Sequence, residues 1–479
     1  MARKGLPAIL AAAVAALAIF AVEASAAGGG SSATVTVSGT QWGVSSCYIG
    51  ATEGNVNFNI NDFTDLGINT YRVYGGMQRW EQQDDDGVFG SPTEAQIKAN
   101  PNVINWAWWD NAITNPPNGS DYWWSGDTGL WQGNATTMLT ALHNAGVRVV
   151  MTLRNVDNNK NPAWASQLNP PNTTDGQNEW WEHVFATVYE LDVRNNFGVD
   201  DWEIHNEPDN SGQGWAGTLT DYENFVNLTS DAIKYVYATY LPGRTPHIYA
   251  PVTTGGSSWP DSVMKANSGA FDSVDVHDYN SDITSYVTTV RGQMAADGFG
   301  NAPLWLSEWG TYKGGYNNAS KGVGLIVTNL IRMSSPATYV YGSHLFTLYD
   351  WDGFSGGFQN FQGLINGSGT RLTSYYALRI ATRALVGCRP TYQSTTTQGN
   401  LTAITTKDAS GAYYVLIANN AASTAYTTTV NLSALKTTGT GTEWQYDATH
   451  NDVVVATPSL SAGKVTVTVP GTSAILLKF

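Results

Sequence analysis

The stretch Asp201–Pro208, which reads Asp-Trp-Glu-Ile-His-Asn-Glu-Pro, has the pattern of a short buried strand that ends in a polar turn at Glu207. A second stretch, Pro303–Gly310, reads Pro-Leu-Trp-Leu-Ser-Glu-Trp-Gly and places Glu308 in a similar position. The two glutamates are 101 residues apart (308 − 207), which leaves room for several strand-plus-helix units between them. The flanking sequence decides whether both strands belong to one fold.

Short apolar, β-branched runs alternate with longer helical patterns between residues 41 and 387. One such pattern, Thr220–Tyr240, has apolar residues at helical spacing after a start at Asp221. Eight alternations predict a parallel (β/α)₈ TIM barrel of the α/β class rather than an open doubly wound sheet, and no Gly-x-Gly-x-x-Gly motif after the first run indicates a nucleotide site. The eight expected strands are Gln41–Cys47, Thr70–Tyr74, Val147–Leu153, Asp201–His205, His247–Pro251, Ser273–His277, Pro303–Ser307 and Tyr339–Leu348.

Residues 388–479 have a different sequence pattern from the barrel region. Seven short runs rich in Thr, Val and Tyr are separated by turn signals such as Asp408–Gly411. This pattern predicts a C-terminal antiparallel β-sandwich domain. Thr34–Val37 alternates in the same way, so the linker at residues 27–40 could add an N-terminal strand to that sandwich.

The first 26 residues read as a secretory signal peptide. Arg3 and Lys4 form a basic start, Leu6–Val22 is mostly apolar, and Ala24–Ala26 has the small-x-small pattern of a cleavage site. A membrane anchor is the alternative, but the cleavage site and the Gly/Ser stretch Gly28–Ser32 favour removal. We therefore expect a secreted or extracytoplasmic protein that is not held at a membrane.

The composition restricts the partners of the mature protein. A formal net charge of −15 disfavours binding to nucleic acid or to acidic membrane surfaces, because proteins bind both through clusters of Lys and Arg. Aromatic residues make up 12% of the chain and include 18 Trp, whereas only 13% of residues are charged. Flat rings stack against the C–H faces of sugars, so neutral glycans fit this composition best. The oligomeric state is left open.

The sequence predicts neither a cofactor nor a metal site. Its two cysteines, Cys47 and Cys388, are too few for a disulfide framework or a Cys-based metal site. Export would permit a disulfide between them, but the sequence leaves their separation open. The acidic run Asp84–Asp86, followed by Gly87, lacks the spacing of an EF-hand loop, and a solvated turn is the better interpretation.

Glu207 and Glu308 fall at the ends of the fourth and seventh expected strands. Catalytic residues of (β/α)₈ barrels gather at this end of the strands. Glycoside hydrolysis needs two carboxyl groups that face one bond, since one protonates the leaving oxygen and the other attacks the sugar or activates water. We therefore take Glu207 and Glu308 as the candidate catalytic residues.

Four polar residues could support these carboxyls. Arg72 is a cation on a strand that should otherwise be apolar, and an ionised carboxylate is the partner that a buried Arg requires. Asn206 precedes Glu207 and suits a hydrogen bond to a sugar 2-hydroxyl. His277 and Tyr279 lie on one face of the sixth strand, which suits Tyr279 to the nucleophile and His277 to sugar or the second carboxylate. A surface Arg and a structural His are the alternatives.

The ordered motifs resemble those of the clan A glycoside hydrolases over the whole barrel. They are Arg72 at strand two, Asn206 and Glu207 before Pro at strand four, His277-x-Tyr279 at strand six, Glu308 within Ser-Glu-Trp-Gly at strand seven, and Trp351 after strand eight. The resemblance implies a retaining enzyme with Glu207 as acid/base and Glu308 as nucleophile. It further implies that Arg72 and Tyr279 contact the nucleophile. Asn206 would then bind the 2-hydroxyl, and Trp351 would lie under the sugar.

The barrel-plus-sandwich layout is similar to that of families thirty-nine, thirty and fifty-one. His205 departs from the pattern, because many relatives carry Trp before Asn-Glu-Pro. Six tryptophans follow the second expected strand in a segment with little core periodicity: Trp106, Trp108, Trp109, Trp123, Trp124 and Trp131. Rings along the catalytic face would grip successive sugars, which favours internal cleavage of a β-linked polysaccharide or oligosaccharide over a pocket for one sugar. Core packing of the rings is an equally open interpretation. An exo-acting enzyme such as a β-xylosidase is the alternative, and an inactive secreted carbohydrate-binding protein is the rival from another class.

Overall fold

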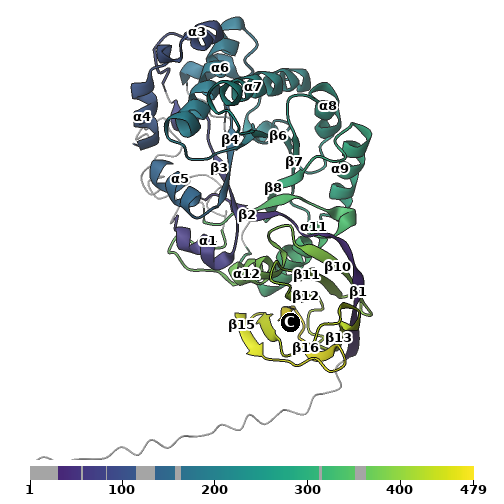
Figure 1. The fold of residues 1–479 in the computed structure, drawn as a ribbon. Helices are drawn as coiled ribbons and strands as arrows, with labels where there is room; N and C mark the ends of the chain where they lie inside the picture. Colours follow the sequence, from purple (N-terminus) through teal and green to yellow (C-terminus); the bar gives the residue numbers. More distant parts are fainter. Residues whose placement is uncertain are drawn as a thin grey trace, which may run out of the picture.

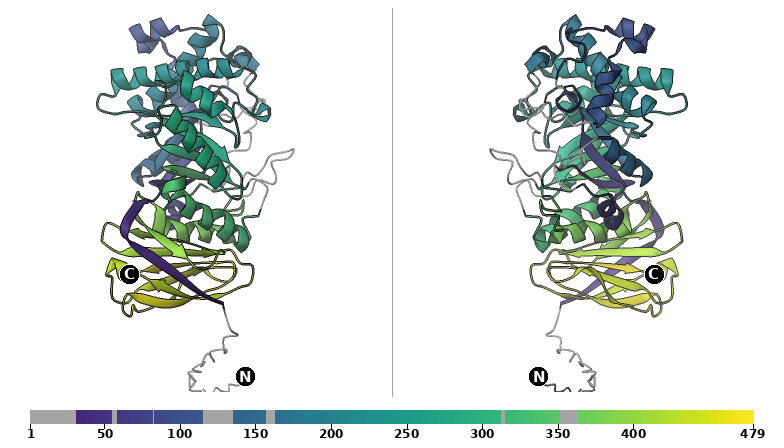
Figure 2. Two further views of the ribbon diagram at one scale, coloured as in Figure 1. Left: turned by 90° about the vertical axis from the view of Figure 1, so that its right-hand side faces the viewer. Right: turned by 90° about the vertical axis from the view of Figure 1, so that its left-hand side faces the viewer.

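The computed structural model describes residues 31–54, 58–81, 83–114, 135–156, 163–311, 315–350 and 363–479. Eight strands close into a parallel barrel, and a nine-stranded, mostly antiparallel sheet forms a second domain beside it (Figure 1). The expected α/β fold, with a TIM barrel followed by a C-terminal β domain, is confirmed. Figure 2 shows the second domain from two further sides, where its strands lie in layers below the barrel helices.

The barrel strands follow one another in sequence order, from β2 to β9. They are β2 (Tyr48–Thr52), β3 (Thr70–Tyr74), β4 (Arg148–Leu153), β5 (Asp201–Ile204), β6 (His247–Thr253), β7 (Ser273–Asp278), β8 (Leu304–Gly310) and β9 (Gly342–Phe346). The placement of the first barrel strand at Gln41–Cys47 was wrong, because Tyr48–Thr52 takes that position. A Cβ atom on Gly50 would lie 1.9 Å from the Thr70 carbonyl oxygen of β3, so close strand packing requires a glycine that weakens the β pattern of this segment.

Helices surround the barrel and follow the expected alternation. They are α1 (Ile60–Leu66), α2 (Met77–Trp80), α3 (Glu94–Ala99), α4 (Trp106–Thr114), α5 (Ala135–Asn144), α6 (Thr174–Val188), α7 (Leu219–Tyr240), α8 (Trp259–Ala266), α9 (Thr284–Ala296), α10 (Ala319–Lys321), α11 (Thr328–Met333) and α12 (Thr373–Leu385). The helix expected over residues 220–240 is α7. Thr218 caps it in a reciprocal capping box with Asp221, and its buried side chains recur at helical spacing. Among the described residues, none of the helices combines the length and apolar character that a membrane span requires.

The second domain has the strand order β15-β14-β17-β12-β11-β10-β1-β13-β16. Its strands are β1 (Ser31–Val44), β10 (Pro390–Thr396), β11 (Leu401–Lys407), β12 (Tyr413–Asn419), β13 (Tyr426–Asn431), β14 (Thr442–Tyr446), β15 (Asn451–Ala456), β16 (Lys464–Val469) and β17 (Ser473–Lys478). The N-terminal strand expected at Thr34–Val37 lies within β1, which pairs antiparallel with β10 and parallel with β13. Because β1 continues to Val44, the segment assigned to the barrel belongs to this sheet instead.

The two domains pack against each other through strands that are buried on both faces. In β12, Val415 and Ile417 belong to the apolar core of the curled sheet, whereas Leu416 and Ala418 join the core of the barrel. A disulfide links Cys47 to Cys388 at this junction, which answers the question that the sequence left open. It joins the segment between β1 and β2 to the segment between α12 and β10.

Candidate active site

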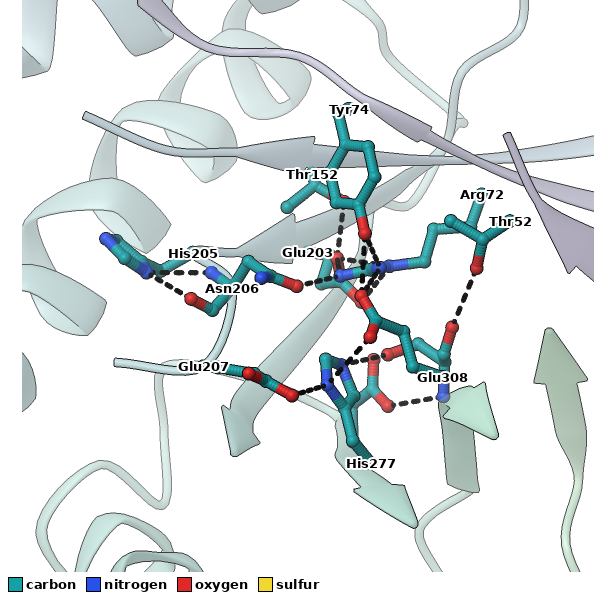
Figure 3. A network of polar contacts seen from close by, with 12 residues as sticks. Thr52, Arg72, Tyr74, Thr152, Glu203, His205, Asn206, Glu207, His277 and Glu308 are labelled. Atoms are coloured by element: carbon teal, nitrogen blue, oxygen red, sulfur yellow. Dashed lines mark hydrogen bonds and ion pairs between the residues drawn. The ribbon is translucent and has the colours of Figure 1, made fainter. Parts of the chain in front are cut away.

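Glu207 and Glu308 meet at the C-terminal ends of the barrel strands, and both are buried (Figure 3). Glu308 lies on β8, whereas Glu207 follows β5 in a turn where it adopts a positive φ of 47°. Such a φ is strained for a residue with a side chain and persists only where the surroundings hold it. Here the Glu207 N–H donates to the Val252 carbonyl of β6 at 2.8 Å. The turn is thus anchored to the neighbouring strand, and it directs the Glu207 side chain into the site.

Arg72 lies at the centre of the network. Its Nη1 donates to Glu308 Oε1 at 2.6 Å, and its Nη2 donates to Asn206 Oδ1 at 2.7 Å. Its Nε lies 2.8 Å and 2.9 Å from the two carboxylate oxygens of Glu203 on β5. The guanidinium is fully buried, so it needs these two negative partners to offset the cost of leaving water.

Glu203 was not identified from the sequence, although it is the main charge partner of Arg72. Burial alone would raise its pKa, but Arg72 and further hydrogen bonds, one of them from Thr152, lower the pKa to about 2. Asp275 on β7 shows the opposite effect, because burial and the charge of Glu203 raise its pKa well above the ordinary value. The sequence did contain a signal for Glu203, namely an acidic residue within an otherwise apolar strand. A basic residue in the same kind of position had pointed to Arg72.

Glu308 is held in its ionised form. Tyr74 donates its hydroxyl to Oε1 at 2.6 Å, and Tyr279 donates to Oε2 at 2.6 Å. Burial would raise the pKa of Glu308, but the charges of His277 and Arg72 and the two tyrosine hydrogen bonds lower it below the ordinary value. Tyr74 was also missed in the sequence, although it lies two residues after Arg72 on the same face of β3.

His277 connects the two glutamates. Its Nδ1 lies 2.9 Å from Glu207 Oε1 and 3.5 Å from Glu308 Oε2, and its Nε2 lies 3.1 Å from Ser307 Oγ. Burial lowers the pKa of His277, but the two carboxylates outweigh it and raise the pKa to about 9. On its other side, Glu207 Oε2 accepts a hydrogen bond from Asn210 Nδ2 at 2.7 Å.

The spacing of the two carboxyls is short. One oxygen of Glu207, one of Glu308 and one nitrogen of His277 all lie within 4.8 Å of one another. These atoms could reach a common metal ion, but the Arg72 guanidinium already lies 2.6 Å from Glu308. A second cation at this place would be repelled, so the electrostatics favour proton transfer and nucleophilic attack by the carboxyls themselves.

Six of the seven residues that the sequence indicated come together in the network. They are Arg72, Asn206, Glu207, His277, Tyr279 and Glu308. Trp351 lies outside the described residues, as do Trp123, Trp124 and Trp131. His205, where many relatives carry Trp, is buried, and its Nε2 lies 3.1 Å from Asn155 Oδ1.

The three tryptophans of α4 pack against the protein. Trp109 is 1% exposed and belongs to the barrel core, so its assignment to a sugar-binding face was wrong. Trp108 donates its Nε1–H to the Trp80 carbonyl at 3.0 Å, and Trp106 stacks on Tyr189 with ring centroids 4.9 Å apart. Both are half-buried. The segment lacks clear helical periodicity in the sequence, but it forms a short helix whose tryptophans pack against the protein.

Neither a protein-family model nor a curated protein matches the sequence. The fold matches solved structures, among them a glucosidase from Croceicoccus marinus, with 15% identity, a TM-score of 0.65, and 93% of this chain and 98% of that one covered. A family 30 subfamily 8 xylanase from Clostridium acetobutylicum has 13% identity and a TM-score of 0.62, with 93% and 99% covered. A GH39 enzyme from Xanthomonas axonopodis pv. citri has 15% identity and a TM-score of 0.63, with 93% and 96% covered. The resemblance to clan A-type hydrolases is thereby confirmed for the barrel-plus-sheet fold.

Proposed function

We propose that the chain is a retaining glycoside hydrolase that cleaves β-glycosidic bonds, with Glu308 as nucleophile and Glu207 as acid/base. The observation that carries the proposal is the pair of close, buried carboxyls bridged by His277, with oxygens within 4.8 Å. Retaining enzymes hold the two carboxyls about 5–5.5 Å apart, whereas inverting enzymes leave about 6.5–9.5 Å for a water molecule. The fold shared with glycoside hydrolases supports the same reaction class.

In the first step, an oxygen of Glu308 attacks the anomeric carbon while protonated Glu207 gives its proton to the leaving glycosidic oxygen. Oε2 suits the attack better than Oε1, because Oε1 accepts from both Arg72 and Tyr74, whereas Oε2 accepts a hydrogen bond from Tyr279. The positive charges of Arg72 and His277 keep Glu308 ionised before the attack.

In the second step, Glu207 takes a proton from water while the water oxygen attacks the anomeric carbon; the bond from that carbon to Glu308 breaks, which releases the carboxylate and gives net retention. His277 and Asn210 hold the two oxygens of Glu207 and orient it for both steps. The Oδ1 of Asn206 accepts from Arg72, which leaves the Nδ2 hydrogens to donate to the sugar 2-hydroxyl.

Proton NMR of a fresh reaction tests the proposal directly. We expect the β-anomer to appear first from a β-linked substrate, followed by slow mutarotation. The inverted anomer as first product would refute double displacement even if both glutamates proved essential, and no hydrolysis of any β-glycan or aryl β-glycoside would favour a carbohydrate-binding protein.

The substrate that we propose is a neutral polysaccharide or oligosaccharide cleaved internally. The net charge of −15 supports the neutral class, and the tryptophans Trp123, Trp124 and Trp131 in the sequence support contacts with successive sugars. Chromatography of early products separates the modes. Mixed oligosaccharides support internal cleavage, whereas monosaccharide alone from the start would establish the exo-acting alternative, such as a β-xylosidase.

We also propose that the enzyme is secreted. The signal-peptide pattern in residues 1–26 supports export, and the disulfide between Cys47 and Cys388 fits an oxidising compartment. Expression of the full chain, followed by N-terminal sequencing of protein from the medium, should give a mature end near Ala27. Intact Met1 on cell-retained protein would contradict export.

A further inference from the structure

His205 directly precedes Asn206 and Glu207, yet the reaction steps assign it no part. The residue is fully buried at the end of β5, and its backbone has a positive φ of 68°. Glu207 also has a positive φ, so two strained residues flank Asn206. Three aromatic rings meet the imidazole edge-on, with centroids between 5.3 Å and 6.4 Å away: Trp215, Tyr222 and Phe225. This packing fixes where the imidazole lies.

Asn155, which follows β4, decides which ring nitrogen of His205 carries a hydrogen. Its side-chain Nδ2 donates to the Leu168 carbonyl, so Oδ1 is the atom that faces His205. His205 Nε2 lies 3.1 Å from this oxygen. An amide oxygen only accepts hydrogen bonds, so the contact requires a hydrogen on Nε2.

The other ring nitrogen, Nδ1, lies beside the backbone of Asn206. It is 2.7 Å from the Asn206 nitrogen and 3.0 Å from the Asn206 carbonyl oxygen. The two contacts are alternatives, because a bare Nδ1 accepts from the N–H, whereas a protonated Nδ1 donates to the carbonyl. Burial lowers the pKa of His205 to about 3, so the imidazole is neutral and carries one hydrogen. With that hydrogen on Nε2, Nδ1 accepts from the Asn206 N–H.

We propose that His205 is a positioning residue whose Nε2–H tautomer holds the Asn206 amide in place for the sugar 2-hydroxyl. The inference rests on the proposed function, in which Asn206 Nδ2 donates to that hydroxyl. Figure 3 shows the chain of contacts from His205 through Asn206 to Arg72. His205 accepts from the backbone N–H of Asn206, and Arg72 donates to its side-chain Oδ1 at 2.7 Å. Backbone and side chain are both held, which leaves Nδ2 for the substrate.

A change of tautomer would disturb this arrangement. A hydrogen on Nδ1 would remove the acceptor of the Asn206 N–H and would draw the Asn206 carbonyl toward the ring instead. That carbonyl belongs to the peptide that leads to Glu207, so the strained turn would shift with it. Asn155 prevents the change, because its Oδ1 rewards only the form with a hydrogen on Nε2.

NMR spectroscopy of protein labelled with ¹⁵N-histidine tests the tautomer independently of activity. The His205 signals are identified by their loss in His205→Asn. In the wild type near neutral pH, we expect a hydrogen on Nε2 and a bare Nδ1. Asn155→Leu removes the acceptor of the Nε2–H, so the Nδ1–H form should gain population. A doubly protonated ring, or a hydrogen on Nδ1 in the wild type, would overturn the proposal.

Kinetics on two substrates tests the consequence for the sugar. An aryl β-glycoside and its 2-deoxy analogue differ only in the hydroxyl assigned to Asn206, and the ratio of their kcat/KM values cancels any loss of folded enzyme. His205→Gln can reach Asn155 but places no acceptor at the position of Nδ1. Relative to the wild type, it should lower the ratio of 2-hydroxy to 2-deoxy substrate roughly 10–100-fold, as expected for a lost hydrogen bond.

Two further variants show whether His205 acts through Asn206. Asn206→Ala should lower the ratio at least as far as His205→Gln, and the double variant should lower it no further than Asn206→Ala alone. Asn155→Leu, which leaves the strained turn unsubstituted, should lower the ratio in the same direction through the tautomer. Additive losses in the double variant would contradict the proposed route.

His205→Asn is the conservative rescue, because Asn tolerates a positive φ and can place an acceptor near the position of Nδ1. It should keep most of the ratio. Trp215→Phe is the matched packing control, since Trp215 packs on the imidazole while its own Nε1–H points to the Thr218 carbonyl. It should lower Tm but keep the ratio.

The outcomes separate the inference from the proposed function. If His205→Gln lowers kcat/KM equally on both substrates, His205 has a structural role only, and the inference fails while the glycosidase assignment stands. If the wild type hydrolyses no β-glycoside, the proposed function fails, and the inference fails with it whatever the tautomer.

Discussion

The polar network around Arg72 and a second set of buried acids (Glu81, Asp85, Glu179 and Glu182) place the same chemical group in opposite electrostatic surroundings. Asp85 is 7% exposed, so the interpretation of Asp84–Asp86 as a solvated turn was wrong for this residue. In the network, Arg72 lies between Glu203 and Glu308, and the pKa values of both carboxyls are lowered despite burial. In the second set, burial is the largest cause and neighbouring acids add to it, so the pKa of Glu182 rises to about 12. Burial therefore does not decide the charge of a carboxyl group by itself. The neighbouring charges and hydrogen bonds act with burial or against it, and their balance sets the direction of the pKa shift.

The largest effect should come from removing the ionised carboxylate of the network. Glu308→Gln should lower kcat roughly 10⁴-fold or more, because an amide cannot form the glycosyl–enzyme bond. Thermal unfolding should show a folded protein, since Glu203 still balances Arg72. Mass spectrometry after treatment with a 2-fluoro glycoside should locate the label on Glu308 in the intact enzyme. A label elsewhere, or an active variant, would refute the assignment.

Glu207→Ala should have a smaller effect that depends on the leaving group. Natural substrates should lose about 10²–10⁴-fold in rate, whereas aryl glycosides with activated leaving groups should keep their first step. Added azide should restore turnover by replacing the missing base. Equal losses on both substrate types, without azide rescue, would show that Glu207 is not the acid/base.

Glu203→Gln and Asp275→Asn test whether two adjacent buried acids carry different charges. Glu203 is ionised against Arg72, so its replacement should cost roughly 3–5 kcal/mol of unfolding free energy. Burial and the charge of Glu203 raise the pKa of Asp275 well above the ordinary value, which favours its neutral form, so its amide should cost less than about 1 kcal/mol. Urea denaturation measures both values. Equal losses would contradict the assigned charge states.

The last prediction concerns how the stability contributed by His277 depends on pH. Burial opposes charge on His277, but Glu308 and Glu207 raise its pKa from the ordinary 6.5 to about 9 in the folded protein. Its contribution to stability is therefore complete below about pH 6.5 and is lost as the pH rises through 9, by at most about 3 kcal/mol. The difference in unfolding free energy between the wild type and His277→Gln should shrink between these limits. A difference independent of pH would show that His277 is neutral in the fold.

Much of this protein was predictable because its periodic patterns are local. Seven barrel strands lie close to their expected positions, and α7 follows its expected pattern. The first strand was misplaced because Gly50, required by contact with Thr70, removes the β-branched signal at Tyr48–Thr52. Glu207 and Glu308 could be predicted as catalytic candidates for a similar reason, since each lies at the end of a recognisable strand.

The sequence by itself determined the barrel, the second β domain and which carboxyls lie at strand ends, because short-range spacing sets the face on which each side chain lies. Only the tertiary structure decided which charges meet. Arg72 reaches Glu203 across 131 residues and Glu308 across 236 residues, and Glu81 reaches His183 across 102. The charge of a buried group depends on the neighbours that folding brings within a few ångströms, and strand and helix periodicity carries no information about these neighbours.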